Sequence, residues 1–419
     1  MILFFKIAQR FLLTYCTLFF VCGVDSAQAM DLKAAIDLSL SQHPTIAAKK
    51  AELEAAQRGA SGSLWQVAPS LSYQSSKNTF GQMQNVTRVQ QPLFVGGRIV
   101  NGVREAHARK DGSYQDLLIA QHEMMIRVSN AYLDVIRLEE RVKTANDSFK
   151  EHERLHQLIV RRNQTGLSSD NDVTLALMRL QQALSELEQM KSQEQSARAL
   201  LSDLVGENVP MQQPLKKPLG QKLSLNSLEE AKRLALEISP LIASQTYKID
   251  VAQAKSAIDR SSLLPQVYLR HDKFGGNAPT TENSLTYIAV EFQLGGGISS
   301  AYAWGASKSL ERSAVGQMES AQKDVIQNLT KDWNQFQLTQ SQIAITRRQL
   351  TSAKQVNESF LRQYSIGKKT WLEVLNAQKE LAQTEYALAD ISTSFHISLI
   401  KIAIATGLMT VDDTDILNK

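Results

Sequence analysis

The chain has no cysteine after its first 29 residues, because both cysteines, Cys16 and Cys22, lie in that opening segment. Disulfide bonds, cysteine metal ligands and a cysteine nucleophile are therefore excluded from the rest of the chain. Aromatic residues make up 6% of the sequence, prolines number 9, and the formal net charge is only +4. So small a surplus of positive charge argues against a nucleic-acid or polybasic membrane partner. The abundance of Gln, Ala, Leu and Ser predicts long helices instead.

The opening segment, residues 1–29, reads as a secretory signal peptide. Lys6 and Arg10 form its basic start, Phe11 to Val24 is mostly apolar, and Ala27-Gln28-Ala29 is a small-x-small cleavage site. We therefore expect export. No later stretch contains about 18 uninterrupted apolar residues, so no membrane-spanning helix is predicted.

The remaining chain contains an internal repeat. Apolar residues, alanines and prolines between Leu32 and Pro69 recur in the same order and spacing between Leu228 and Pro265. The sequence thus predicts two copies of one unit. The predicted parts are a first repeat at residues 30–206, a linker at 207–226, a second repeat at 227–407 and a C-terminal tail at 408–419.

Each unit reads as a helix, two strands, a long helix, a turn and a shorter helix. The first unit gives Leu32–Gln66 with a break near Pro44, Ser70–Phe80, Gln84–Phe94, Ile99–Arg162 and Ser169–Val205. The second gives an opening helix at Leu228–Ser262 and strands at Gln266–Phe274 and Leu285–Leu294. Stacked end to end, the shorter helix of the first unit and the opening helix of the second would match the long helix in length, and so cover its apolar stripe.

The long helix carries a heptad seam. Its seam positions are Met124, Val128, Ala131, Val135, Leu138, Val142, Ala145, Phe149, His152, His156 and Ile159. This spacing predicts a coiled coil. At about 1.5 Å per residue the helix would be roughly 95 Å long, which no compact domain requires.

The predicted strands alternate in polarity, most clearly in the last one. Ile288, Val290 and Phe292 are separated by Ala289 and Glu291. Such alternation is typical of transmembrane β-barrel strands. Four strands cannot close a barrel, and an open edge in lipid leaves unpaired backbone groups, so membrane-spanning strands would require an oligomer.

The two hairpins end in similar turns. Gly166 and Gly367 mark them, and an acid follows at the same distance in each, at Asp172 and Glu373. With the repeat and the run Gln91-Pro-Leu-Phe-Val-Gly-Gly-Arg98, these turns make the chain resemble the outer membrane efflux protein family typified by TolC. The resemblance covers nearly the whole chain after the signal peptide.

The resemblance implies a mainly α protein with a membrane β-barrel portion, built as a homotrimer. Its four strands per chain would form a 12-stranded barrel in outer-membrane lipid, and its coiled-coil hairpins a periplasmic tunnel. It would be a channel without enzymatic activity or cofactor. Its partners would be a periplasmic adaptor protein and an ABC or proton-driven inner-membrane transporter, in drug efflux or type I protein secretion. The sequence does not choose between these cargoes.

The family closes its tunnel near the hairpin tips and has a cation-selective acidic constriction there. By position, the gate and constriction residues of this chain are Asp172, Tyr364, Lys369, Glu373 and Asn376. Family members often have arginine where Lys369 stands and aspartate where Asn376 stands. Alternatively, Asp172 and Glu373 are first-turn acids that stabilise helix N-termini.

The turns themselves would dock the periplasmic adaptor. The tip residues are Gly166, Leu167, Ser168, Gly367 and Lys368. The simpler interpretation of the two glycines is that they end helices in the left-handed conformation. Both interpretations can hold together.

A competing motif is His152-Glu153-Arg154-Leu155-His156, which matches the H-E-x-x-H helix of zinc proteases. Both histidines lie on the heptad seam, so a structural histidine pair is the expected interpretation, with no metal. A second alternative to the channel is a periplasmic coiled-coil scaffold without a pore.

Overall fold

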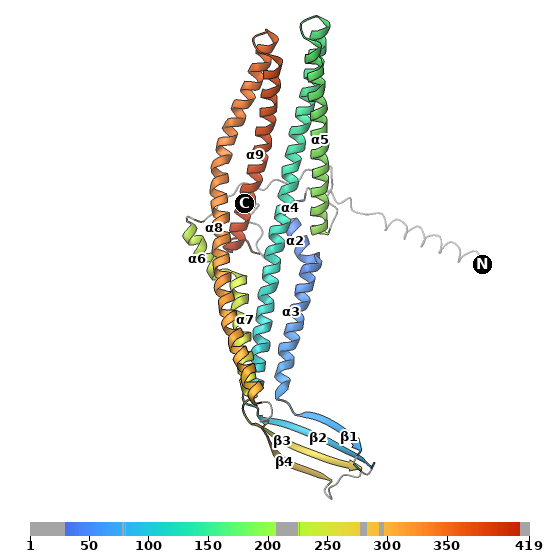
Figure 1. Ribbon diagram of the computed structural model, residues 1–419, viewed down its shortest axis with the longest axis vertical. Helices are drawn as coiled ribbons and strands as arrows, with labels where there is room; N and C mark the ends of the chain where they lie inside the picture. Colours follow the sequence, from blue (N-terminus) through green and yellow to red (C-terminus); the bar gives the residue numbers. More distant parts are fainter. Residues whose placement is uncertain are drawn as a thin grey trace, which may run out of the picture.

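The computed structural model describes residues 30–77, 79, 81–206, 225, 227–276, 283–292 and 297–410. The molecule is elongated, with two helical hairpins at one end and a sheet at the other (Figure 1). The predicted signal peptide, nearly all of the predicted linker and residues 411–419 of the predicted tail lie outside the described residues.

The two halves of the chain contain the same order of elements. The first half contains α2 (Leu32–Gln42), α3 (Pro44–Ser63), the 3-10 turn η1 (Leu64–Val67), β1 (Ser70–Lys77), β2 (Met83–Phe94), α4 (Arg98–Gln164) and α5 (Asp170–Val205). The second contains α6 (Leu228–Ile238), α7 (Pro240–Ser261), β3 (Gln266–Gly276), β4 (Ser284–Glu291), α8 (Gly297–Ser365) and α9 (Trp371–Ala405). The expected break at Pro44 is present, and Pro240 breaks the second opening helix in the same way. Each proline begins a new helix, where its missing N–H costs nothing.

Each long helix is covered along its length by shorter helices of its own half. Along α4, of 67 residues, lie α5, of 36, and then α2 and α3, of 11 and 20 (Figure 1). Along α8, of 69 residues, lie α9, of 35, and then α6 and α7, of 11 and 22. The expectation that α5 is continued by the opening helix of the second unit is wrong, because α5 meets α2. The helix α7 packs against both α4 and α8 and so joins the halves.

The main core lies at mid-length, where α2, α4, α5 and α9 meet. The predicted seam of α4 supplies Met124, Val128 and Val135, which are 2%, 0% and 0% exposed. Tyr132 is also fully buried, and its hydroxyl donates a hydrogen bond of 2.8 Å to the backbone oxygen of Met30. Nearer the tips, the seam histidines are only partly buried. By length and composition α9 could cross a membrane, but it packs against α8 and α4 as a core helix does.

A buried ion cluster crosses from α4 to α5. Arg198, 2% exposed, contacts Glu139 on α4 and Glu194 one turn earlier on α5, the latter at 3.0 Å. A buried guanidinium without carboxylate partners would be costly, so these contacts fix how the two helices face each other.

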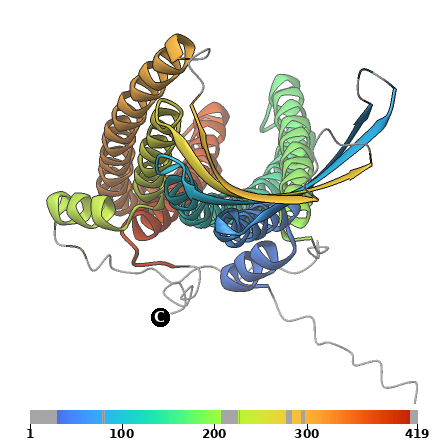
Figure 2. The same ribbon diagram turned by 90° about the horizontal axis from the view of Figure 1, so that it is seen from below.

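The sheet is antiparallel throughout, in the order β1-β2-β3-β4, and it is curved (Figure 2). The two halves of the chain meet at the β2–β3 pair. One face carries large apolar side chains that are exposed in the single chain. They are Leu71, Tyr73, Val89, Leu269, Ile288 and Val290. The predicted alternation of polarity in β4 is therefore real, although the strand ends at Glu291, earlier than expected.

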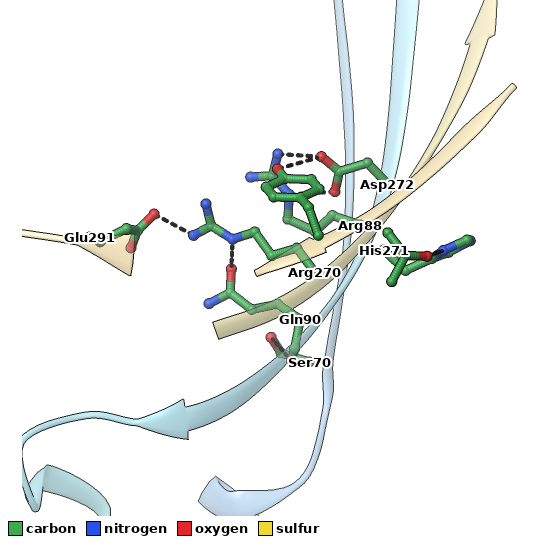
Figure 3. A network of polar contacts seen from close by, with 9 residues as sticks. Ser70, Arg88, Gln90, Arg270, His271, Asp272 and Glu291 are labelled. Atoms are coloured by element: carbon green, nitrogen blue, oxygen red, sulfur yellow. Dashed lines mark hydrogen bonds and ion pairs between the residues drawn. The ribbon is translucent and has the colours of Figure 1, made fainter. Parts of the chain in front are cut away.

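The opposite face of the sheet carries a polar network (Figure 3). Arg88 donates two hydrogen bonds to Asp272, of 2.7 and 2.8 Å, across the β2–β3 pair. The hydroxyl of Tyr287 on β4 donates a third to Asp272, at 3.1 Å. Beside them, Arg270 donates to Gln90 at 2.8 Å and contacts Glu291 (Figure 3). The pairs cross-link three strands and leave their charges balanced.

The turn from β2 into α4 rests on the other half of the chain. Gly96 has a φ of +62°, and a Cβ there would lie 3.0 Å from the backbone oxygen of Ser261, at the end of α7. A side chain at this position would therefore be strained and crowded. The closeness of this contact explains why a glycine stands at this position of the run from Gln91 to Arg98.

The burial pattern of α5 allows a matched stability test. Leu201 is 0% exposed and Leu200 is 55% exposed. We expect Leu201→Ala to lower the free energy of unfolding by about 2–5 kcal/mol, because it removes buried methyl groups and leaves a cavity. Leu200→Ala should change it by less than about 0.5 kcal/mol. Urea unfolding of the detergent-solubilised protein, followed by circular dichroism, measures both. Equal losses would contradict the described packing.

Candidate functional site

The tips of both hairpins are built in the same way. Gly166 and Gly367 have φ values of +72° and +74°, and the amide of each bonds to a carbonyl three residues earlier, at 2.9 and 3.1 Å. The next amides, of Leu167 and Lys368, bond five residues back, at 2.8 and 2.9 Å. These are the two hydrogen bonds of a Schellman motif, which ends a helix at a glycine. Beside the glycines, Leu167 and Ile366 are each 66% exposed.

The returning helices begin with identical capping boxes. Asp172 accepts hydrogen bonds from the amide and hydroxyl of Ser169, at 3.1 and 2.9 Å, and from the hydroxyl of Ser168, at 3.0 Å. Glu373 accepts from the amide and hydroxyl of Thr370, at 2.8 and 2.9 Å. Both acids thus satisfy free amides at a helix start. Within one chain, the contacts of Asp172 and Glu373 are those of first-turn acids that cap a helix, as the alternative interpretation expects.

The two acids differ in their charged neighbours. The Lys369 ammonium donates a hydrogen bond of 2.6 Å to Glu373. This bond, followed by those from Thr370, lowers the pKa of Glu373 to about 2. For Asp172, burial raises the pKa, but the hydrogen bonds from Ser169 and Ser168 outweigh it and hold the pKa below its usual value. Both carboxylates are ionised at neutral pH, and Glu373 is neutralised by Lys369, which lies in the turn just before its helix.

The third residue of the expected gate, Tyr364, lies in an apolar cluster between the hairpins. It is 8% exposed, and its ring centroid lies 5.5 Å from that of Trp371. The Arg162 guanidinium of α4 lies 4.9 Å from the same ring centroid. The cluster also contains Leu155, Ile159, Ala176, Val374 and Leu375, from α4, α5 and α9. The first and second hairpins therefore meet through the ring of Tyr364.

The expected gate residues are not one network within the chain. Lys369 contacts Glu373 and the ring of Phe360, at 4.4 Å, while Asp172 bonds to its own cap. No hydrogen bond or ion pair joins Asp172 to Tyr364 or Lys369 among the described residues. The contact of Arg162 with the ring of Tyr364 joins the two hairpins, whereas Trp371 packs on that ring within the second hairpin. Neither Arg162 nor Trp371 was assigned to the gate from the sequence. Arg162 reads as an ordinary C-terminal helix cation, and no single-helix pattern reveals that it faces Tyr364.

Further from the tips, a second set of contacts joins α4 to α9. Arg137 donates a hydrogen bond of 3.1 Å to Asp390, and Arg141 lies 3.6 Å from the same carboxylate. The Arg141 guanidinium also lies 4.9 Å from the ring centroid of Tyr386. This set of four residues fixes the hairpins to each other well below the tips.

The last expected gate residue, Asn376, is exposed and lines a groove between α5 and α9 with a volume of about 580 Å³. His152 of the H-E-x-x-H motif lines the same groove. Burial lowers the pKa of His152, and Arg179 lowers it further against the opposing effect of Glu151. In the part of the chain that the structure describes, no cluster of three or more metal-ligating side chains includes this histidine pair.

The sequence pattern of one family, described as outer membrane efflux protein, matches residues 35–207 and 232–408. The "Cobalt-zinc-cadmium resistance protein CzcC" of Cupriavidus metallidurans is 24% identical over 86% of this chain and 85% of its own. The "Alkaline protease secretion protein AprF" of Pseudomonas aeruginosa is 23% identical over 78% of this chain and 70% of its own.

Among solved structures, the outer membrane protein VceC of Vibrio cholerae superposes with a TM-score of 0.77. It covers 90% of this chain and 96% of its own at 18% identity, which shows that the fold is shared. The family match spans most of both halves, with their long hairpins and strand pairs. The chain therefore belongs to the outer membrane efflux protein family, and it is an outer-membrane channel for efflux or secretion that extends into the periplasm.

Proposed function

We propose that three copies of this chain form one duct, with a 12-stranded barrel in outer-membrane lipid and a helical tunnel across the periplasm. The observation that carries the proposal is the open sheet. Its outer strands, β1 and β4, each have one edge without a partner strand among the described residues, and one of its faces is apolar and exposed. In lipid, each unpaired backbone group costs several kcal/mol, so such a sheet needs neighbouring copies to close it.

In this duct the chain consists of two structural repeats, residues 30–206 and 227–407, joined by the linker at 207–226. The polar face of the sheet lines the barrel, and the apolar face contacts lipid. Four strands per chain, closed by two further copies, give a barrel wide enough for a water-filled lumen.

The hairpin tips form the periplasmic gate. Arg162 and Tyr364 hold the second hairpin against the first. Lys369 directly precedes the N-cap of α9, Glu373 and Asn376 lie on the first turns of α9, and Asp172 lies on the first turn of α5. Three copies of each would surround the mouth, where rings of charge control conduction. The exposed turns, Gly166-Leu167-Ser168 and Gly367-Lys368, are the docking points of a periplasmic adaptor, which an inner-membrane transporter drives.

The cargo depends on those partners. One relative is named for resistance to cobalt, zinc and cadmium, and another for secretion of a protease. A duct of this type therefore serves either an ABC transporter or a proton-driven pump, and the duct itself performs no catalysis.

The proposed duct is tested by placing a charge on each face of the sheet in turn. We expect the detergent-extracted protein to be a trimer that conducts in a planar bilayer. Ile288→Lys places a charge on the exposed apolar face of β4 and should reduce insertion, by about 2–4 kcal/mol at mid-membrane depth. Ala289→Lys, on the opposite face, should insert normally. Extraction of the unaltered protein by salt or high pH without detergent would support the scaffold alternative and overturn the duct.

The gate is tested at Tyr364. We expect Tyr364→Ala to raise the open fraction of the channel about tenfold, because a partly desolvated cation–π contact contributes about 1–2 kcal/mol. Tyr364→Phe keeps the ring beneath Arg162 and should stay closed. Single-channel recording measures both variants. If Tyr364→Phe opens the channel as far as Tyr364→Ala does, the hydroxyl rather than the ring holds the gate.

The charge of Glu373 is tested by pH. Its pKa of about 2 lies below the ordinary 4.5, so the carboxylate stays ionised as the pH falls from 7 to about 4. The difference in reversal potential between the unaltered channel and Glu373→Gln should therefore be constant over that range. In a Lys369→Met background the largest cause of the low pKa is gone while the hydrogen bonds from Thr370 remain, so the difference should begin to fade at a higher pH than in the unaltered channel. Loss of the difference near pH 5 with Lys369 intact would contradict the described pair.

A further inference from the structure

The groove between α5 and α9 lies just inside the tips and is lined mainly by polar side chains. Its walls include Arg179, Gln182 and Glu186 from α5, and Asn376, Lys379 and Gln383 from α9. Its volume of about 580 Å³ is within the range of small-molecule sites. Because Asn376 is one of the proposed constriction residues, the groove opens onto the passage that the gate controls.

Two cations of this groove have hydrogen-bonding capacity to spare. Arg179 donates through Nη1 to the Gln182 side chain at 2.9 Å, while its Nε is buried and has no acceptor among the described residues. Lys379 is exposed and forms no ion pair within the described part of the chain. Guanidinium and ammonium donors surrounded by amide side chains form a site suited to a carboxylate or phosphate.

One acid, Glu186, is among the residues that line the groove, against the two cations Arg179 and Lys379. Glu186 lies beside the buried ring of Tyr386, where burial and then the charge of Glu186 raise the pKa of that phenol. Glu373 is paired with Lys369 at 2.6 Å, and position 376 carries a neutral amide. The lining of the groove therefore carries two positive charges against one negative charge.

We propose that the groove of Arg179 and Lys379 beside Asn376 is a binding site for small organic anions, and that it makes the periplasmic mouth favour anionic over cationic solutes. The proposal rests on the duct and gate proposed above. It departs from the cation-selective constriction that the family resemblance implies. In the assembled duct, three such grooves would face one passage and raise the local concentration of anions there.

The test uses the full-length mature protein in a planar bilayer, with citrate as the probe on the side of the tips. We expect citrate to reduce the current at millimolar concentration, and the reversal potential in a KCl gradient to favour chloride. The double variant Arg179→Gln/Lys379→Gln should weaken the citrate effect by about tenfold or more, because it removes charge-assisted hydrogen bonds. Mannitol, an uncharged solute of similar size, should have no such effect.

Two further variants keep the test decisive. Lys50→Gln neutralises an exposed lysine on α3, far from the tips, and should leave the citrate effect unchanged. Asn376→Asp places a carboxylate in the groove without deleting a cation, and should weaken the citrate effect and shift selectivity toward potassium. Circular dichroism and trimer mass confirm that each variant is folded.

The outcomes separate this inference from the duct itself. A conducting channel that citrate does not block, or that citrate blocks equally in the double variant, overturns the anion site and leaves the duct intact. A folded trimer that never conducts overturns the duct and the anion site together. Cation selectivity of the unaltered channel that Arg179→Gln/Lys379→Gln leaves unchanged also overturns the anion site.

Discussion

The structure depends on covering the apolar seam of a very long helix. A helix of 67 residues, such as α4, exposes its seam to water unless partners run beside it for its full length. The chain meets this requirement with α5 toward the tips and with α2 and α3 toward the sheet. The ends of these covering helices are therefore set by the points along α4 where one of them ends and the next begins. The same constraint, applied to α8, fixes the lengths of α9, α6 and α7. Repetition of one unit therefore follows from one packing problem that the chain solves twice.

Much of this architecture could be predicted from the sequence, because it rests on local signals. Prolines at 44 and 240, the glycines of the turns and the heptad seam of α4 locate most element boundaries to within a few residues. The pairing of α5 could not be predicted, since α2 and α6 carry equivalent repeat positions and offer similar apolar faces. Tertiary packing decides whether α5 is followed by α2 or by α6, and a comparison of helix lengths carries no information about it.

At the candidate site too, local features could be predicted from the sequence, whereas contacts between distant residues could not. The sequence and the family resemblance located both tips, and the structure explains the acids there as cap residues that accept hydrogen bonds from Ser169 and Thr370. The contact of Arg162 with the ring of Tyr364 was missed, because it joins residues far apart in the chain through the face of a ring and leaves no spacing pattern. The residue types at 369 and 376 did carry information, since a lysine and an amide at those positions would contribute to the charge of the mouth in the proposed duct.

The close packing of Gly96 against the end of α7 has a mechanical consequence. Near the sheet, the two halves of the chain are locked by backbone contact, by the helix α7 and by the paired strands. Toward the tips they meet through side chains, in the apolar cluster around Tyr364 and in the contact of the Arg162 guanidinium with its ring. In the proposed duct, each hairpin would act as a lever anchored at the barrel. A small force applied at its free end would then move the mouth with little strain in the barrel.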